Sequence, residues 1–293
     1  MSEISADEYS RNWFLSRTLV QAAKEMIDSV AKINRRDFCT TACAAVASLT
    51  FAAACRSRSR SNESGLSSDG RLAARPHSSV ALSANASVGK PIKLGLDQER
   101  DALLYLPRSA TNSPLPLLLF LHGATQSAED MFWYLDSAPD ETGVAILAPN
   151  SRDTTWDAIT GGFGPDVEFV NRALERVFET VTIDPARVAV GGFSDGATYA
   201  ISLGLINGDL FKLVAAFSPG FVIDGTREGM PQIFISHGTR DRILPIDSCG
   251  RRGAVELKSR GYQVTLREFD GRHEIPGDVM REGLRWVAAS GQQ

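Results

Sequence analysis

A strand, a tight turn and a helix are predicted in direct succession between residues 188 and 203. The apolar run Val188-Ala-Val-Gly leads into Gly192-Phe-Ser194-Asp-Gly196, and a helix-compatible run follows at once. Glycine has no Cβ, so the chain can close a turn there that other residues would obstruct. Such a turn lifts the serine hydroxyl above the sheet, where the free N–H groups of the helix N-terminus also point. The segment therefore predicts a nucleophilic serine at Ser194, a prediction that Gly-x-Ser-x-Gly alone would not support.

A serine hydroxyl is a useful nucleophile only when a base takes its proton and an acid orients that base. The chain has four histidines. His77 lies in a polar tract, and His122 and His237 each end an apolar run in a His-Gly pair, which favours a structural role at a strand end. His273 instead follows a predicted strand and a polar turn, and it is the predicted base.

The predicted acid is Asp241, which lies just after a predicted strand and between Ser194 and His273 in the chain. A carboxylate at a strand end can reach an imidazole on a neighbouring loop. The alternative candidate, Asp247, lies beyond a proline and is better placed to cap the next helix. The alternative interpretation of Asp241 is a surface ion pair with a neighbouring arginine.

Two backbone N–H groups are predicted to bind the negative oxygen that forms when a serine attacks a carbonyl. One belongs to Asp195, directly after the nucleophile, and the other to Ala124, in the loop that follows the predicted strand at 115–122. Such donors each contribute about 3–4 kcal/mol to transition-state stabilisation.

Strand-like and helix-like segments alternate through the rest of the domain, which predicts an α/β fold: a mostly parallel twisted sheet with helices on both faces. Its length leaves no room for a large cap over a minimal core. Strands are expected at 101–106, 115–122, 144–149, 187–193, 213–218, 232–237 and 263–269, and helices at 127–138, 166–181, 195–206, 248–260 and 277–289.

Four short motifs carry a family resemblance: Phe120-Leu-His-Gly123, Gly192-Phe-Ser-Asp-Gly196, His237-Gly…Asp241…Ile-Leu-Pro245 and Gly271-Arg-His-Glu-Ile-Pro276. Together with the order Ser…Asp…His they resemble the phospholipase/carboxylesterase/thioesterase branch of the α/β-hydrolases. The chain is also similar to polyhydroxybutyrate-depolymerase and feruloyl-esterase-like proteins, over roughly residues 92–289. The resemblance implies an ester or thioester hydrolase without a cofactor, with Ser194, Asp241 and His273 as its triad. Asp195 stands where acyl-protein thioesterases usually have Gln, which argues against a cytosolic thioesterase substrate.

The expected activity is that of a carboxylesterase-like serine hydrolase acting through an acyl-enzyme on a small-molecule or polymeric ester. A polyester depolymerase or a serine peptidase would use the same residues. An inactive hydrolase-fold binding module is a third hypothesis, disfavoured because all three triad residues are present. Four aromatic residues either line an acyl or aryl pocket or pack the core: Phe132, Trp133, Trp156 and Phe163.

Composition excludes several other classes. The net charge is −4, and the folded region holds no basic tract of the kind that binds nucleic acid. It also lacks Cys/His spacing for a metal and a glycine-rich loop for phosphate. No metal and no cofactor are therefore expected.

Residues 1–55 are predicted to be an N-terminal extension and an export leader. Asn34-Arg-Arg-Asp-Phe38 resembles a twin-arginine signal, and the uncharged run after it is too short and weakly apolar to span a membrane. It closes in Ala52-Ala-Ala-Cys55, which resembles a lipobox, so that Cys55 is either lipidated as a membrane tether or only adjoins a cleavage site. An uncleaved anchor, or translation from Met26, are the alternatives. Residues 56–90 are predicted to be a flexible Ser/Arg-rich tether, and 91–293 the catalytic domain, exported and periplasmic or extracytoplasmic.

Overall fold

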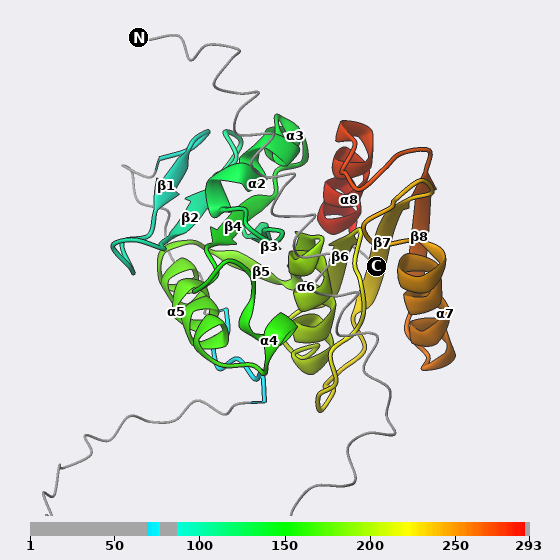
Figure 1. Ribbon diagram of the computed structural model, residues 1–293. Helices are drawn as coiled ribbons and strands as arrows, with labels where there is room; N and C mark the ends of the chain where they lie inside the picture. Colours follow the sequence, from blue (N-terminus) through cyan, green and yellow to red (C-terminus); the bar gives the residue numbers. More distant parts are fainter. Residues whose placement is uncertain (1–68, 77–86, 291–293) are drawn as a thin grey trace, which may run out of the picture. The chain divides into compact units, whose positions relative to one another are not determined.

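The computed structural model describes residues 69–76 and 87–290, in which eight strands form one twisted sheet (Figure 1). The strand order is β1-β2-β4-β3-β5-β6-β7-β8. β2 pairs antiparallel with β1 and β4, and every other neighbouring pair is parallel. The strands are β1 (Pro91–Lys93), β2 (Ala102–Tyr105), β3 (Leu115–Leu121), β4 (Ala145–Pro149), β5 (Ile183–Phe193), β6 (Leu213–Phe217), β7 (Gln232–Gly238) and β8 (Val264–Phe269).

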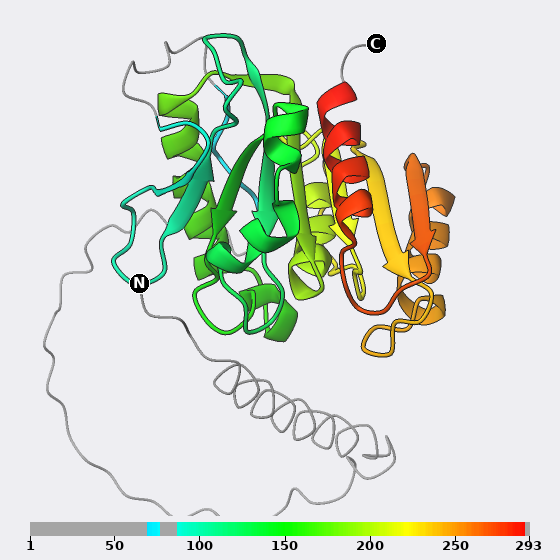
Figure 2. The same ribbon diagram turned by 90° about the horizontal axis from the view of Figure 1, so that it is seen from above.

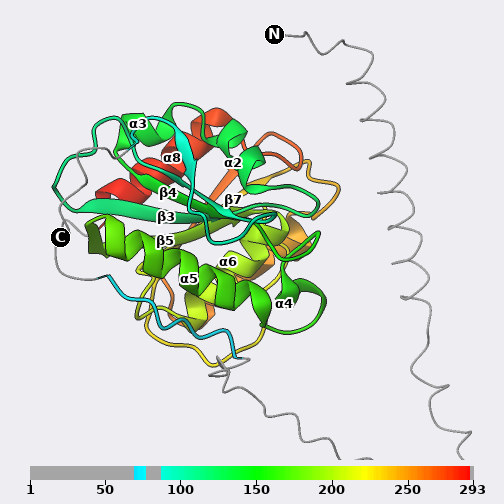
Figure 3. The same cartoon turned by 90° about the vertical axis from the view of Figure 1, so that its left-hand side faces the viewer.

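Helices cover both faces of this sheet (Figure 3). One face carries α2 (Ala128–Leu135), α3 (Ala138–Thr142) and α8 (Gly277–Ala289). The other carries α4 (Asp157–Thr160), α5 (Pro165–Thr180), α6 (Asp195–Ile206) and α7 (Arg252–Ser259), the last preceded by a π-helical turn, η1 (Asp247–Arg251). Figure 2 shows α8, in red, and α7, in orange, on opposite sides of the strands.

The two helical layers give two hydrophobic cores, and β3 contributes to both. Its side chains alternate between the sheet faces because successive Cβ atoms of a strand point in opposite directions. Leu117, Leu119 and Leu121 join the core beneath α5 and α6, whereas Leu118 and Phe120 join the core beneath α2 and α8. A strand buried on both faces is uniformly apolar, as β3 is.

The predicted α/β fold is confirmed, and each predicted strand and helix is present within a few residues of its expected bounds. The short elements β1, α3 and α4 were not predicted. A single helix was predicted at 248–260, which the structure divides into η1 and α7.

The predicted tether at 56–90 is wrong for residues 69–76, which we call the docked segment. Leu72 and Ala74 are each 3% exposed and belong to the core beneath α5 and α6. Buried asparagines bind its backbone: Asn207 Oδ1 accepts from Leu72 N at 2.8 Å, and Asn171 Oδ1 accepts from Ala73 N and Ala74 N at 2.7 and 2.9 Å. Composition alone did not reveal these partners, which lie about a hundred or more residues along the chain.

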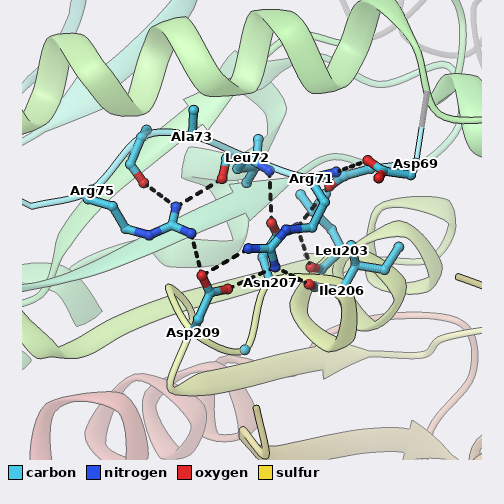
Figure 4. Close-up of polar contacts among 12 residues, drawn as sticks. Asp69, Arg71, Leu72, Ala73, Arg75, Leu203, Ile206, Asn207 and Asp209 are labelled. Atoms are coloured by element: carbon cyan, nitrogen blue, oxygen red, sulfur yellow. Dashed lines mark hydrogen bonds and ion pairs between the residues drawn. The ribbon is translucent and has the colours of Figure 1, made fainter. Parts of the chain in front are cut away.

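Charged groups fasten the docked segment at its surface. Arg71 makes two hydrogen bonds of 3.0 Å to the carboxylate of Asp209, and Arg75 binds the same carboxylate (Figure 4). The catalytic domain, predicted to begin at residue 91, therefore includes the docked segment. It also includes residues 87–90, where Gly89 N donates to Leu106 O at 2.8 Å.

The predicted leader at 1–55 and the remaining tether residues, 56–68 and 77–86, lie outside the described residues. Among the residues that are described, none of the helices has the length and apolar character needed to cross a bilayer.

Shortening the buried side chain of the docked segment should destabilise the domain. Leu72→Ala is expected to lower the free energy of unfolding by about 2–5 kcal/mol, because it leaves a cavity in a packed core. The matched control is Ala73→Ser, at the exposed neighbouring position, which should change it by less than about 0.5 kcal/mol. Urea unfolding measures both values. Equal, near-zero effects would mean that the segment is not docked in solution.

Candidate active site

Ser194 occupies a strained turn between β5 and α6. Its φ is 55° and its ψ −118°, a conformation that a residue with a side chain rarely adopts. Neighbouring backbone holds it there: Ser194 N donates to Phe217 O on β6 at 3.0 Å, and Ser194 O accepts from Thr198 N at 3.0 Å. Strain of this kind persists only where the surrounding structure enforces it, and it occurs often at active sites.

The glycines on either side of Ser194 are required by close backbone approach. A Cβ on Gly196 would lie 2.2 Å from Leu121 O and 2.4 Å from His122 O, and one on Gly192 would lie 2.5 Å from Gly196 O. These distances are shorter than any real Cβ contact, and the obstructing atoms belong to the backbone. The first turn of α6 is thereby packed directly on the end of β3.

The structure brings the three predicted residues together in one chain of hydrogen bonds. His273 Nε2 lies 2.9 Å from Ser194 Oγ, and His273 Nδ1 lies 2.6 Å from Asp241 Oδ2. The side chain of Asp241 is fully buried and that of His273 is nearly so. The other oxygen of Asp241 accepts from the backbone N–H groups of Ile243 and Leu244 at 2.8 and 2.9 Å.

The loops that carry Asp241 and His273 are joined at the ends of β7 and β8. Thr239 N donates to Phe269 O and Arg240 N to Gly271 O, each at 2.9 Å. The imidazole of His273 also packs against the Phe193 ring, with a centroid distance of 4.8 Å. Parallel pairing of β7 and β8 therefore places the carboxylate and the imidazole side by side at the carboxyl edge of the sheet.

The predicted donors are the backbone N–H groups of Ala124, in the loop after β3, and of Asp195, the first residue of α6. A Cβ on Gly123 would lie 3.4 Å from the Cβ of Ser194, which places the loop after β3 beside the serine. Gly123 O accepts from His122 Nδ1 at 2.8 Å and from Gln126 N at 3.2 Å. The Ala124 N–H lies on the opposite side of the same trans peptide and so points away from those groups. Within the described residues neither it nor the first N–H of α6, from Asp195, has a hydrogen-bond partner.

His122 is completely buried and serves as a structural support for this loop. Its Nδ1–H donates to Gly123 O, its Nε2 accepts from Ser151 N at 3.0 Å, and its carbonyl accepts from the Trp156 indole at 2.8 Å. Burial lowers the pKa of His122, so it remains a neutral imidazole with one donor and one acceptor.

His237 lies closer to the site than the sequence analysis anticipated. Its side chain is fully buried, and its Nε2 is 3.3 Å from Asp241 Oδ2. Its position four residues before Asp241, at the end of a predicted strand, could have indicated this proximity. The His-Gly pair was instead interpreted as a purely structural feature of the strand end.

The four aromatic residues considered for a pocket do not lie together. Trp156 and Phe163 pack in the core beneath α5 and α6, where both contact Tyr199, so the pocket interpretation is wrong for them. Phe132 is partly buried against Tyr105, and Trp133 is 85% exposed on α2. Trp156 still supports the site from beneath, through its bond to His122 O.

A cavity of about 400 Å³ lies beside α4. Thr155 Oγ1 in its wall donates to Asp195 Oδ2 at 2.7 Å, which links the cavity to the first residue of α6. Its lining residues are mostly hydroxyl, carboxylate and glycine residues: Arg152, Asp153, Thr154, Thr155, Asp157, Thr160, Gly161, Gly162, Pro165 and Asp166.

Two carboxylates hold the loop that forms this cavity. Asp166 accepts from the backbone N–H groups of Arg152 and Asp157 at 2.6 and 2.7 Å, while Asp157 Oδ2 accepts from those of Gly164 and Asp166, each at 2.9 Å. Burial raises the pKa of Asp166 to about 6, even though these backbone hydrogen bonds favour the ionised form. Among the described residues, no group of three or more His, Cys, Asp or Glu side chains could hold a metal ion.

Comparison with known proteins agrees with this architecture. Residues 166–289 match the family model described as Phospholipase/Carboxylesterase. Feruloyl esterase C of Emericella nidulans is 30% identical over 135 residues, which cover 45% of this chain and 48% of that protein. S-formylglutathione hydrolase of Bos taurus is 28% identical over 141 residues, which cover 40% of this chain and 50% of that protein. The chain thus spans about half the length of these relatives.

Among solved structures, the fluorophosphonate-binding serine hydrolase FphF of Staphylococcus aureus aligns with a TM-score of 0.58. The alignment covers 70% of this chain and all of that one, at 15% identity, which is evidence of a shared fold only. The chain has the α/β-hydrolase fold, and its sequence is carboxylesterase-like.

The pKa of Asp166 should make stability depend on pH. The folded protein keeps this proton up to about pH 6, whereas the unfolded chain releases it near pH 4, so unfolding releases a proton between these values. Stability should therefore fall as pH rises from about 4 to about 6, by up to about 3 kcal/mol from this group. Denaturant unfolding between about pH 4 and pH 6 measures this loss of stability. The loss should be absent in Asp166→Asn and retained in Asp224→Asn, a control at an exposed position. If the unfolding free energy of wild type and Asp166→Asn changed equally with pH, the raised pKa of Asp166 would be contradicted.

Proposed function

We propose that the protein is a serine hydrolase that cleaves carboxylic esters through an acyl-enzyme, with Ser194 as nucleophile, His273 as base and Asp241 as the acid. The observation that carries the proposal is the pair of contacts made by one imidazole, 2.9 Å from Ser194 Oγ and 2.6 Å from Asp241 Oδ2. A carboxylate facing Nδ1 favours the proton there, which leaves the Nε2 lone pair free for the serine hydroxyl.

In the first half-reaction Ser194 Oγ attacks the ester carbonyl carbon while His273 Nε2 takes the hydroxyl proton. Negative charge develops on the carbonyl oxygen, which the N–H groups of Ala124 and Asp195 bind. His273 then gives the proton to the departing alcohol, and an acyl-serine remains. Water attacks this acyl group by the reverse sequence of proton transfers, releasing the acid and restoring the serine. Buried Asp241 stabilises the imidazolium in both halves.

The proposed substrate is a small-molecule or polymeric carboxylic ester. Two observations support it: the similarity to a feruloyl esterase, and the cavity whose wall residue Thr155 is hydrogen-bonded to Asp195. We propose that the alcohol portion of the substrate enters on the side of this cavity.

We also propose that the chain is exported, on the basis of Arg35-Arg36 and the apolar run that follows. Under this proposal the domain is periplasmic or extracytoplasmic, and Cys55 is a candidate lipid anchor.

Ser194→Ala should fold normally and lose nearly all esterase turnover. Removing a triad serine lowers kcat by about 10⁶, because the remaining donors give only a small fraction of the rate. Turnover of p-nitrophenyl acetate measures the loss, and a fluorophosphonate probe should label the wild type but not the variant. A variant with a tenth of wild-type kcat would refute the assignment of the nucleophile.

Two aspartates in the same region test the acid separately. Asp241→Asn should lower kcat by about 10⁴, since an amide no longer holds the imidazole in the required tautomer. Asp247→Asn is the matched control: this carboxylate is largely exposed and pairs with Arg251 at 2.7 Å, away from His273. The reverse ranking would transfer the role to Asp247.

Replacing the paired arginines of the leader tests export. Arg35→Lys with Arg36→Lys should leave the full-length chain in the cytoplasm, as seen by fractionation and immunoblotting. Cys55→Ala should separate anchoring from export: if the cysteine is lipidated, wild type partitions into the membrane fraction and the variant becomes soluble. Unchanged export of the double-lysine variant would rule out the twin-arginine route.

A further inference from the structure

A second histidine lies against the proposed catalytic acid. His237 ends β7 with its side chain fully buried, and its imidazole lies 3.3 Å from Asp241 Oδ2, the oxygen that also faces His273. Neither the family resemblance nor the order of the triad residues gives His237 a role.

The hydrogen bonds of His237 define which nitrogen carries its proton. Nε2 lies 2.7 Å from Leu244 O, and a carbonyl oxygen can only accept, so Nε2 is the protonated nitrogen. Nδ1 is buried and has no hydrogen-bond partner among the described residues, as expected of the unprotonated position. Burial lowers the pKa of His237, which keeps the ring neutral despite the adjacent carboxylate.

The Nε2–H of His237 thus lies between two parts of the same loop. It donates to Leu244 O and faces Asp241 Oδ2, while Leu244 N donates to Asp241 Oδ1. Asp241 Oδ2 consequently has a histidine nitrogen on either side: His273 Nδ1, hydrogen-bonded at 2.6 Å, and His237 Nε2 at 3.3 Å, whose proton is donated to Leu244 O. The carboxylate cannot rotate without losing contacts from both of its oxygens.

The opposite side of the His237 ring is packed against the π-helical turn η1. A Cβ on Gly250 would lie 2.6 Å from His237 Nδ1 and 3.0 Å from Cγ, so only glycine leaves room for the ring. π-Helical turns are rare and often occur at functional sites. A π-helical turn has one residue more than an α-helical turn, and here the turn places the Gly250 backbone against the His237 ring. The other side of the ring contacts the loop that carries Asp241.

The remaining charges near His237 are already paired. Glu268 is its register partner on β8, and both oxygens of Glu268 are bound by Arg251 at 2.8 and 2.6 Å. The groups that face the imidazole are therefore Asp241, His273 and this neutralised pair, so that Asp241 is the carboxylate on which a His237 N–H can act.

We propose that His237 is a positioning residue for the hydrolytic reaction: clamped by Gly250, it donates to Leu244 O and so holds the loop whose N–H groups keep the Asp241 carboxylate facing His273. The inference rests on the proposed function, since it concerns the same triad. It predicts that the His237 N–H dipole, 3.3 Å from Asp241 Oδ2, also stabilises the negative charge of that carboxylate. Without that donor, Asp241 should stabilise the His273 imidazolium more strongly.

Two substitutions of different chemistry test this role. His237→Met keeps an apolar side chain of similar bulk but has no donor, and it should lower kcat by about tenfold to a hundredfold with little change in KM. It should also move the acidic limb of the pH profile of kcat/KM, where activity falls as His273 becomes protonated, to higher pH. His237→Gln restores an N–H near the Nε2 position and should recover much of kcat and return the limb toward its wild-type position. Every rate is expressed per site labelled by a fluorophosphonate, so that misfolded protein does not contribute.

Gly250→Ala displaces the ring without removing it, and should lower kcat and move the acidic limb in the same direction as His237→Met. Its matched control is Gly253→Ala, three residues further along in α7, where a Cβ would meet nothing within 4 Å. This pair carries the test if His237→Met does not fold.

Three outcomes would overturn the proposal. One is that His237→Met keeps more than half of wild-type kcat per labelled site. Another is that the Met and Gln variants lose kcat equally with an unmoved acidic limb, which is what a purely structural histidine would give. The third is that Gly250→Ala matches Gly253→Ala. Failure of the proposed function is distinguishable, since the wild type itself would then show neither labelling nor turnover.

Discussion

The contact on which the site depends is the direct packing of backbone on backbone where α6 begins. Gly196 lies so close to Leu121 O and His122 O that no side chain could be accommodated. This contact joins the ends of β3 and β5, the central parallel strands, and it forces Ser194 into its positive φ. The same contact brings the loop after β3 beside the serine, so the nucleophile and the proposed donor at Ala124 are placed by one packing arrangement.

Two buried histidines stabilise the loops on either side of that contact, and they do so in opposite tautomers. His122 donates from Nδ1 and accepts at Nε2, which orients the Gly123–Ala124 peptide. His237 donates from Nε2 and lies against the acid loop. Burial lowers the pKa of both, so neither brings a charge into the core. Each is followed by a glycine that permits a close approach: His122-Gly123 follows β3, where Gly123 lies against the Gln126 side chain, and His237-Gly238 ends β7, where Gly238 lies against the backbone of Arg272.

The docked segment shows how polar side chains can attach a stretch of chain that has little hydrophobic content. Leu72 is its one large buried apolar residue, but Asn171 and Asn207 bind its backbone and Asp209 binds its two arginines. Asn207 and Asp209 follow the C-terminal end of α6, whereas Ser194 precedes its N-terminal end. The segment is therefore attached at the end of α6 remote from the proposed nucleophile.

Local pattern was sufficient for most of the fold and for the choice of three site residues. Alternation of apolar runs with helical periodicity located the strands and long helices, because burial on one or both faces constrains every residue of such an element. The glycines around Ser194 and the loop position of His273 were also visible as local features. Short elements such as β1 and α4 were missed because three or four residues carry too little periodic signal.

What the sequence by itself determined was therefore the set of strands and helices and the residues at their ends, since these follow from steric and hydrophobic rules acting over a few neighbours. Tertiary structure alone decided which distant groups meet. It buried Trp156 and Phe163 beneath the site instead of in a pocket, it attached residues 69–76 to asparagines far along the chain, and it placed His237 against Asp241. Those contacts depend on strand order and on the close approach of separate loops, and no local pattern in the chain specifies either.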